Sequence, residues 1–286
     1  QNYTISGRIS DSKTGEDLVG ATVAIQGTTS GVSTNSYGFY SLTIAKGEYK
    51  VSFRYIGYEE VIKTISLTKN TTLNIELTEK AKDIDEVVIS AKAEDAKVEN
   101  KQINVIKLDM QTVKRIPVVF GEIDILKTVT MLPGIISAGE GNSGFSVRGG
   151  MQDQNLILLD EATVYNVSHL LGFFSVFNGD AIRDLDVYKG GIPAQYGGRL
   201  ASLIDIRMKE GNNKKFAGTG GIGLLSSRLT LEGPIVKNKG SFIVSGRRSY
   251  ADIFLPLAPA EEVQNSQLYF YDLNAKVNYK ISEKDR

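Results

Sequence analysis

Apolar and polar residues alternate in short runs along the first eighty residues, and glycine-containing turns separate the runs. From Tyr49 to Tyr55 every second residue is apolar or aromatic, and Leu73, Ile75 and Leu77 repeat the pattern. A period of two places one set of side chains in a core and the other in water, as in a half-buried strand. Several such strands at this spacing predict a small antiparallel β-sandwich over residues 1–79.

Residues 80–115 interrupt this pattern, because they are charged and weakly patterned, which is typical of a linker. Inside them lies an apolar, β-branched segment, Ile84-Asp85-Glu86-Val87-Val88-Ile89-Ser90. An extended segment of this kind can add a strand to the sheet edge of another protein, or it can form one more strand of a neighbouring domain. The residues alone leave both interpretations open.

Residues 116–210 mix helical and extended patterns. A helix is predicted over Gly121–Leu132, because its apolar residues fall on one helical face and Pro133-Gly134 ends it. The other elements expected here are a central strand at 155–160, a helical turn at 180–185, a strand at 186–189 and a strand at 200–209. This order predicts a mixed α/β domain.

The last seventy residues carry a long alternation. From Tyr269 to Ile281 apolar residues occupy one face and polar residues the other, and 226–233 alternate in the same way. The longer run exceeds the roughly 9–11 residues that cross a bilayer as a strand, and aromatic residues lie at its ends. A phase shift at Leu224-Leu225 predicts a bulge or a strand boundary. The pattern favours membrane strands, and a long hairpin in a soluble sheet is the alternative.

Composition excludes several classes of function. Lys plus Arg and Asp plus Glu number 33 each, so the formal charge is zero and the chain lacks the positive field that attracts nucleic acid. There is no Cys and one His, so we expect no disulfide, no metal site, no cofactor and no hydrolase built on zinc. No apolar run reaches the ~18 residues of a membrane helix. The start at Gln1 rather than Met is taken as a processed or trimmed chain.

Three local features call for a chemical interpretation. Gly139 to Gly144 form a G-x-G-x-x-G pattern, but strand-like residues follow it, whereas a dinucleotide site needs a helix there. His169 has no partner in a catalytic motif and is interpreted as a loop or core histidine. Arg148, between an apolar strand and a glycine pair, is either a buried ion-pair partner or a solvated arginine at a strand end.

Three segments, in this order, resemble the TonB-dependent outer-membrane receptors of the Bacteroidota type. Residues 1–79 resemble a carboxypeptidase-regulatory-like domain through Ser6-Gly7, Thr14-Gly15, Gly20-Ala21-Thr22-Val23, Gly27-Thr28, Tyr37-Gly38-Phe39-Tyr40, Gly47-Glu48-Tyr49 and Tyr55-Ile56-Gly57-Tyr58. Residues 116–210 resemble the receptor plug through Leu132-Pro133-Gly134, Phe145-Ser146-Val147-Arg148-Gly149-Gly150, Leu158-Leu159-Asp160, Val187-Tyr188-Lys189-Gly190-Gly191 and Tyr196-Gly197-Gly198-Arg199-Leu200. The segment at 84–90 lies where such receptors carry a TonB-box-like sequence.

The resemblance implies a mainly β fold: an antiparallel β-sandwich (1–79), a linker (80–115), a mixed α/β plug (116–210) and the first strands of an antiparallel transmembrane β-barrel (211–286). Residues 211–286 supply about three or four strands, so the chain is expected to be the N-terminal part of a longer receptor. The implied function is plug-gated uptake of a scarce nutrient (an iron chelate, cofactor, peptide or glycan), energised through TonB. The alternative is a soluble periplasmic or surface binding or adhesion module built on the sandwich.

The resemblance also implies site residues and partners. The TonB-coupling segment comprises Asp85, Glu86, Val87, Val88, Ile89 and Ser90, and the structural or gating residues of the plug are Arg148, Gly149, Gly150, Asp160, Gly190, Gly191, Gly197, Gly198 and Arg199. The implied partners are TonB, outer-membrane lipid, an unknown small ligand and, in some receptors, a surface lipoprotein. The location implied is the outer membrane, with the sandwich and linker in the periplasm. Gly149-Gly150 and Leu159-Asp160-Glu161 are similar to the general receptor group rather than to glycan importers.

Overall fold

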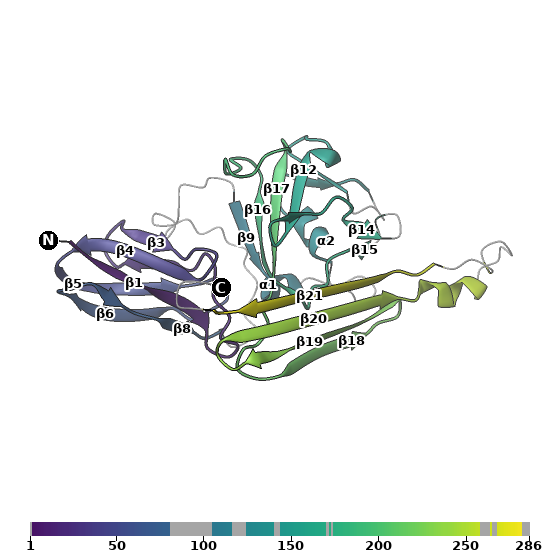
Figure 1. Cartoon of the computed structure of the whole chain (residues 1–286). Helices are drawn as coiled ribbons and strands as arrows, with labels where there is room; N and C mark the ends of the chain where they lie inside the picture. The colour runs from purple at the N-terminus through teal and green to yellow at the C-terminus, as the bar shows by residue number, and fades with distance from the viewer. Residues whose placement is uncertain are drawn as a thin grey trace. The chain divides into compact units, whose positions relative to one another are not determined.

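A computed structural model describes residues 2–80, 105–115, 124–139, 144–169, 172, 174–257, 264 and 268–281 (Figure 1). The chain divides into two compact units, Gln1–Lys101 and Gln102–Arg286, and each is considered by itself. Within the described ranges, no helix combines the length and the apolar character that a membrane-spanning helix needs.

The first unit is the expected β-sandwich. One sheet has the order β4-β1-β7, with β8 also paired to β1, and the other has the order β3-β2-β5-β6. The strands are β1 (Asn2–Asp11), β2 (Thr22–Ile25), β3 (Gly31–Ser33), β4 (Phe39–Ala45), β5 (Gly47–Arg54), β6 (Val61–Leu67), β7 (Thr71–Thr72) and β8 (Ile75–Leu77). Side chains of both sheets share one core that includes Ile5, Tyr40 and Phe53. The sandwich departs from a purely antiparallel arrangement, because β1 pairs in parallel with β7 and β8.

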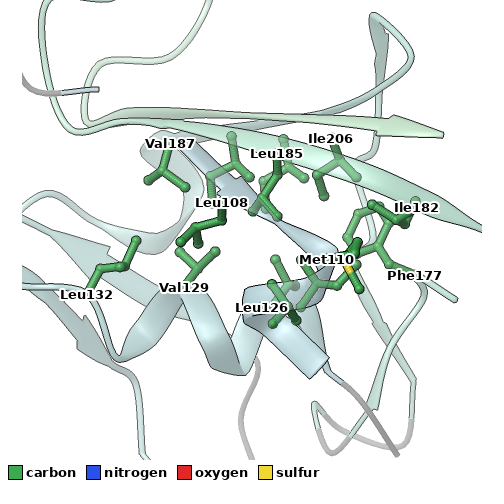
Figure 2. Packing of buried hydrophobic residues seen from close by; sticks show 14 of the residues in the cluster. Leu108, Met110, Leu126, Val129, Leu132, Phe177, Ile182, Leu185, Val187 and Ile206 are labelled. Carbon is green, nitrogen blue, oxygen red and sulfur yellow. The ribbon is translucent and has the colours of Figure 1, made fainter. Parts of the chain in front are cut away.

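The second unit contains a five-stranded sheet of order β13-β12-β17-β16-β9. Its strands are β9 (Val105–Asp109), β12 (Asn155–Leu159), β13 (Ala162–Thr163), β16 (Ile182–Tyr188) and β17 (Ser202–Met208). One face packs on the helices α1 (Met110–Arg115) and α2 (Ile125–Thr130). Figure 2 shows Leu185 and Val187 of the sheet and Leu126 and Val129 of α2 in this buried cluster. The strand predicted at 155–160 lies inside the sheet, as expected.

Shorter elements surround this sheet. They are the strands β10 (Ile135–Ser137), β11 (Phe145–Val147), β14 (Ser168–His169) and β15 (Phe174–Ser175) and the 3₁₀ helix η1 (Gln152–Gln154). β10 pairs with β11, and β14 pairs with β15, in both cases antiparallel. The domain is therefore mixed α/β, with most of its residues extended.

Three sequence predictions in this domain need correction. The helical turn predicted at 180–185 is wrong, because β16 already begins at Ile182, held between β17 and β9. The helix predicted from Gly121 begins at Ile125, where the Asp124 carboxylate caps it by accepting hydrogen bonds from the next backbone N–H groups; residues 121–123 lie outside the described ranges. The predicted linker extended to residue 115, yet residues 105–115 form β9 and α1 of this domain.

The last part of the chain forms a four-stranded antiparallel sheet of order β18-β19-β20-β21 (Figure 1). Its strands are β18 (Ala217–Ile222), β19 (Ser226–Val236), β20 (Gly240–Ser249) and β21 (Tyr271–Tyr279), and the 3₁₀ helix η3 (Ala251–Leu257) follows β20. The boundary predicted at Leu224-Leu225 is confirmed, since it falls between β18 and β19. The predicted alternation is also confirmed: the exposed residues of β21 are Tyr271, Leu273, Ala275, Val277 and Tyr279.

Candidate functional site

The face of the four-stranded sheet opposite its exposed apolar side lies against the mixed α/β domain, and we call this contact the junction. Because side chains alternate along a strand, the residues that enter the junction are mostly polar. From the sheet they are Arg228, Thr230, Ser241, Ile243, Ser245, Arg247, Asp272 and Lys276. Their partners come from the segments 160, 169–180 and 208–210 of the mixed domain.

Asp180 anchors one end of the junction. Its side chain is 3% exposed, and its carboxylate accepts a hydrogen bond at 2.7 Å from Nε of Arg228 on β19. The ammonium of Lys114 on α1 lies 3.7 Å from the other carboxylate oxygen. Burial lowers the pKa of Lys114, and the neighbouring Lys209 adds to this, while Asp180 opposes it. One buried carboxylate thus joins a helix of the mixed domain to the four-stranded sheet.

Next to Asp180, buried amide and hydroxyl groups continue the contact. Nδ2 of Asn178 donates to Oγ of Ser245 on β20 at 2.5 Å, and Thr230 Oγ1 lies 2.9 Å from the same hydroxyl. Asn178, Thr230 and Ser245 are all buried, so these hydrogen bonds satisfy groups that would otherwise be costly to desolvate.

Asp160 makes a second ionic contact. One of its carboxylate oxygens lies 2.9 Å from the ammonium of Lys276 on β21, and the other accepts the backbone N–H of Met208 at 3.0 Å. Asp160 and Glu161 form the two-residue turn between β12 and β13, with φ angles of 46° and 69°. Two positive φ values match a type I′ hairpin turn, which non-glycine residues adopt at a cost. The carboxylate contacts of Asp160 help to hold this conformation.

A third contact joins the β14–β15 hairpin to β20 and β21. Nε2 of His169 lies 2.6 Å from Asp272 of β21, and the imidazole stacks on Phe270 with centroids 4.2 Å apart. Arg247 of β20 donates from Nε to Asp272 at 3.0 Å and from Nη2 to the backbone carbonyl of Ser175. His169 therefore acts as a packing and pairing residue of the junction, with no nucleophile among these contacts.

The junction also has an apolar part. Ile243 of β20 is fully buried and belongs to the same cluster as Leu126, Leu185 and Ile206 of the mixed domain. A side chain of the four-stranded sheet therefore completes the core of the neighbouring domain. Since burial of an aliphatic side chain is worth about 1.5–3 kcal/mol, the two parts stabilise each other.

Two of the predicted plug residues meet in space. Arg148 has φ of 51°, and a Cβ added at Gly190 would lie 3.2 Å from its Nη1 atom. The Arg148 side chain is exposed, so the hypothesis of a buried ion pair is wrong. Gly150 has a different reason to be glycine, because a Cβ there would lie 2.4 Å from Cβ of Ala201. Gly150 therefore allows the end of β11 and the segment that precedes β17 to approach closely.

The remaining predicted residues are more scattered. Gly149, Gly191 and Gly198 have positive φ, Gly197 has open space around it, and the exposed Arg199 donates to the carbonyl of Gly198 at 3.0 Å. Asp160 belongs to the junction instead. The six residues from Asp85 to Ser90 lie outside the described ranges, so their role stays a prediction.

Residues 140–143 of the Gly139–Gly144 pattern lie outside the described ranges. The residues that follow the pattern, Phe145–Val147, form strand β11, whereas a dinucleotide site needs a helix to begin there. In the part of the chain that the structure describes, no group of three or more His, Asp or Glu side chains could hold a metal ion.

The face of the five-stranded sheet opposite α1 and α2 carries a buried ionic cluster. Arg207 contacts Asp184, Asp186 and Asp205 at 2.6, 2.9 and 3.1 Å. Burial disfavours the charge of Arg207, but Asp184 and Asp186 outweigh it and raise its pKa. Burial raises the pKa of the Asp205 carboxyl, although Arg207 opposes this. Burial also raises the pKa of the nearby Tyr188 to about 12.

Sequence reasoning missed the junction residues Asp180, Arg228, Arg247, Asp272 and Lys276. A signal existed for Arg228, Asp272 and Lys276, since they fall on the polar side of the predicted membrane strands at 226–233 and 269–281; no strand was predicted around Arg247. Their partners could not be found in this way, because Asp180 and Asp272 lie 48 and 25 residues from the arginines that they bind.

Comparison with known proteins identifies two parts of the chain. Residues 5–89 match the family model of the CarboxypepD_reg-like domain, and residues 119–202 match that of the TonB-dependent Receptor Plug Domain. The chain therefore carries both domains, in the order that the sequence resemblance implied, and plug domains belong to transport receptors rather than to enzymes. No curated protein sequence matches the chain.

Several solved structures match parts of the chain. The siderophore receptor PirA from Acinetobacter baumannii is 18% identical with a TM-score of 0.46, and the match covers 64% of this chain and 30% of that one. A double mutant of the ferric enterobactin receptor PfeA from Pseudomonas aeruginosa is 18% identical with a TM-score of 0.45, covering 66% and 32%. A cohesin–X-dockerin complex from Acetivibrio cellulolyticus is 25% identical with a TM-score of 0.24, covering 27% and 58%. The chain spans about a third of the length of the receptors that it matches.

Proposed function

Starting from a chain that carries a TonB-dependent receptor plug behind a CarboxypepD_reg-like domain, we propose that it is the N-terminal part of an outer-membrane receptor for active uptake. In this proposal residues 1–79 and the linker that follows them lie in the periplasm, and residues 211–286 begin the barrel. The plug comprises residues 116–210 together with β9 and α1 (105–115), which the linker therefore loses. The cargo is a scarce nutrient such as an iron chelate, cofactor, peptide or glycan.

One observation carries the proposal: the four-stranded sheet is apolar on its exposed side and polar on the side that contacts the plug. Tyr271 and Tyr279 lie at the two ends of β21, a strand of 9 residues. This length falls within the roughly 9–11 residues that a tilted strand needs to cross a bilayer, and aromatic residues are typical of both interfaces of membrane barrels. A soluble adhesion module would place polar residues outside, so the pattern supports the membrane receptor over that alternative.

The junction supports gating by movement of the plug. Two ion pairs, Asp160–Lys276 and Asp180–Arg228, hold the plug to the sheet, and both cations retain partial exposure to solvent. Water can replace such partners at a modest cost, whereas separation of two large apolar surfaces would be expensive. The buried contact of Ile243 provides the rest of the free energy that opposes separation of the plug from the sheet. A pull on the plug can therefore release it from the sheet in steps.

We place the site of that pull in the segment from Asp85 to Ser90. An extended, β-branched segment can add to an exposed sheet edge of TonB through backbone hydrogen bonds, which hold against force with little dependence on side chains. Outer-membrane lipid, a small ligand above the plug and, in some receptors, a surface lipoprotein complete the set of proposed partners.

Lipid exposure of the sheet can be tested with nitroxide labels, because the chain contains no Cys that would compete for the label. Leu273→Cys places the label on the exposed side of β21, and Asn274→Cys places it on the side toward the plug. In bilayers we expect high accessibility to oxygen and low accessibility to a water-soluble nickel chelate at 273, and not at 274. A label at 273 that reports water would overturn the membrane proposal.

Energy coupling has its own test. Val87→Pro removes a backbone donor and fixes φ, so it should abolish cross-linking of this segment to the purified periplasmic domain of TonB. Ala96→Pro, in the charged stretch that follows, is the matched control and should cross-link like the wild type. Equal cross-linking of Val87→Pro and the wild type would refute the coupling role of Asp85–Ser90.

A further inference from the structure

One charged side chain lies on the exposed apolar side of the four-stranded sheet. Among the described residues of β18 to β21, Arg248 is the only Lys, Arg, Asp or Glu that faces this way. Its neighbour Arg247 points into the junction and is buried. The position of Arg248 is therefore a departure from an otherwise apolar surface.

Two tyrosines of β21 and the segment before it lie next to Arg248. Its guanidinium carbon lies 5.7 Å from the centroid of the Tyr269 ring, and Tyr271 is its direct cross-strand neighbour on β21. Both tyrosines are exposed, at 48% and 73%. Within the described part of the chain no carboxylate forms an ion pair with Arg248. A planar cation stacked on a ring keeps its N–H edge available for an anion.

Arg248 lies at one end of the apolar band rather than in its middle. Leu273, Ala275 and Val277 follow Tyr271 along the exposed side of β21, and Leu229 and Leu231 of β19 lie in the same rows. An arginine is costly near the bilayer midplane but well tolerated at the interface, where lipid headgroups begin. Its depth therefore corresponds to that of the headgroup phosphates.

The connections between strands indicate which leaflet this is. At the Arg248 end, residues 223–225 join β18 to β19 and residues 250–270 join β20 to β21, whereas residues 237–239 join β19 to β20 at the other end. The longest of these three connections is therefore at the Arg248 end. In outer-membrane barrels the long connections are extracellular and the short turns periplasmic. Arg248 is thus on the outer-leaflet side.

We propose that Arg248, with Tyr269 and Tyr271, binds a phosphate group on the headgroup of an outer-leaflet glycolipid. This inference rests on the proposed membrane function. The guanidinium supplies two parallel N–H donors that match two phosphate oxygens, and the tyrosine rings cover the stem of the side chain and the first part of the acyl region. The site would hold one lipid against the exposed side of the four-stranded sheet, at the end where Arg248 lies.

The test uses the full-length receptor in detergent and native mass spectrometry. The probes are lipid A with two phosphates and the same lipid after removal of both phosphates. We expect the wild type to retain the phosphorylated lipid at least about tenfold better than the dephosphorylated one. Arg248→Gln should lose this preference, Arg248→Lys should keep part of it, and Lys237→Gln, which removes an exposed cation at the opposite end of the sheet, should behave as the wild type.

Two results would overturn the site: equal retention of both lipids by the wild type, or unchanged preference in a folded Arg248→Gln receptor. The comparison of the two lipids needs no variant, so it decides the matter even where Arg248→Gln fails to fold. The nitroxide at position 273 separates this inference from the one that it rests on. If the label at 273 is exposed to lipid and the receptor shows no preference for the phosphorylated lipid, only the headgroup site at Arg248 is refuted. If the label at 273 is exposed to water, both the headgroup site and the membrane proposal are refuted.

Discussion

The carboxylate of Asp180, on the segment that leads into β16, accepts a hydrogen bond at 2.7 Å from the guanidinium of Arg228 on the first hairpin of the four-stranded sheet. The pair joins the plug to the sheet across 48 residues of sequence. Lys114 of α1 shares the same carboxylate, so Asp180 connects three separate elements.

Asp180→Asn should therefore destabilise the plug. The change leaves Arg228 and Lys114 without their counter-charge, and since both are partly solvated we expect a loss of about 2 kcal/mol rather than the full cost of a buried charge. Proteolysis of the plug during a urea titration of the receptor measures this loss. Asp153→Asn, on the exposed helix η1, is the control, and equal midpoints for the two variants would contradict the proposed role of the pair.

Ile243→Ala should be costly, because it opens a cavity where β20 enters the core of the plug. A large-to-small change at a fully buried aliphatic position costs about 2–4 kcal/mol. Val244→Ala, one residue further on and on the exposed side of the same strand, should cost less than about 1 kcal/mol. The same urea titration compares the two variants. If both lower the unfolding midpoint by the same amount, the burial of Ile243 does not stabilise the plug.

Gly150→Ala should destabilise the plug by about 1–3 kcal/mol, because the new Cβ would lie 2.4 Å from Cβ of Ala201 and the two segments would have to separate. Gly197→Ala, where nothing lies within 4 Å, is the matched control and should change stability by less than about 0.5 kcal/mol. Thermal unfolding of the receptor provides the measurement. The double variant Gly150→Ala/Ala201→Gly should recover most of the loss, and a failure to recover would place the strain elsewhere.

The ionic cluster around Arg207 predicts a dependence on pH. Because burial raises the pKa of Asp205, the folded chain holds this proton more tightly than the unfolded chain. The folded state then loses stability as the pH rises from about 4, the ordinary value for Asp, through the raised pKa. Asp205→Asn lacks this proton, so the stability of the wild type relative to the variant should fall between pH 4 and pH 7. If the urea midpoints of the wild type and of Asp205→Asn differ by the same amount at pH 4 and at pH 7, Asp205 does not contribute to the pH dependence.

Elements with a strict period of two could be predicted from sequence, because their pattern reports burial directly. β21 and the β5 strand of the sandwich are examples, as is the apolar run of β12. β16 was partly missed, since Asp184 and Asp186 interrupt its apolar residues and their neutralisation by Arg207 comes from another strand. β9 was hidden for a related reason: its partner β16 lies some eighty residues away, and its own residues are partly charged.

In the candidate site, too, the features that depend on local sequence could be predicted and those that depend on distant partners could not. The glycines of the plug motif could be named from sequence because a fixed backbone conformation requires them locally, as at Gly190 and Gly198. For Arg148 the sequence left two interpretations, a buried ion pair and a solvated arginine at a strand end, and the exposed side chain near Gly190 excludes the first. The partners across the junction depend on tertiary structure, and no local pattern encodes which aspartate Lys276 or Arg228 will meet.

The burial of Ile243 has a consequence for the order in which such a receptor assembles. A mixed domain whose core includes a side chain of β20 cannot complete its packing before β20 is in place. In the receptor that we propose, the plug and the first strands of the barrel should therefore fold together, and the plug should not enter a barrel that is already closed.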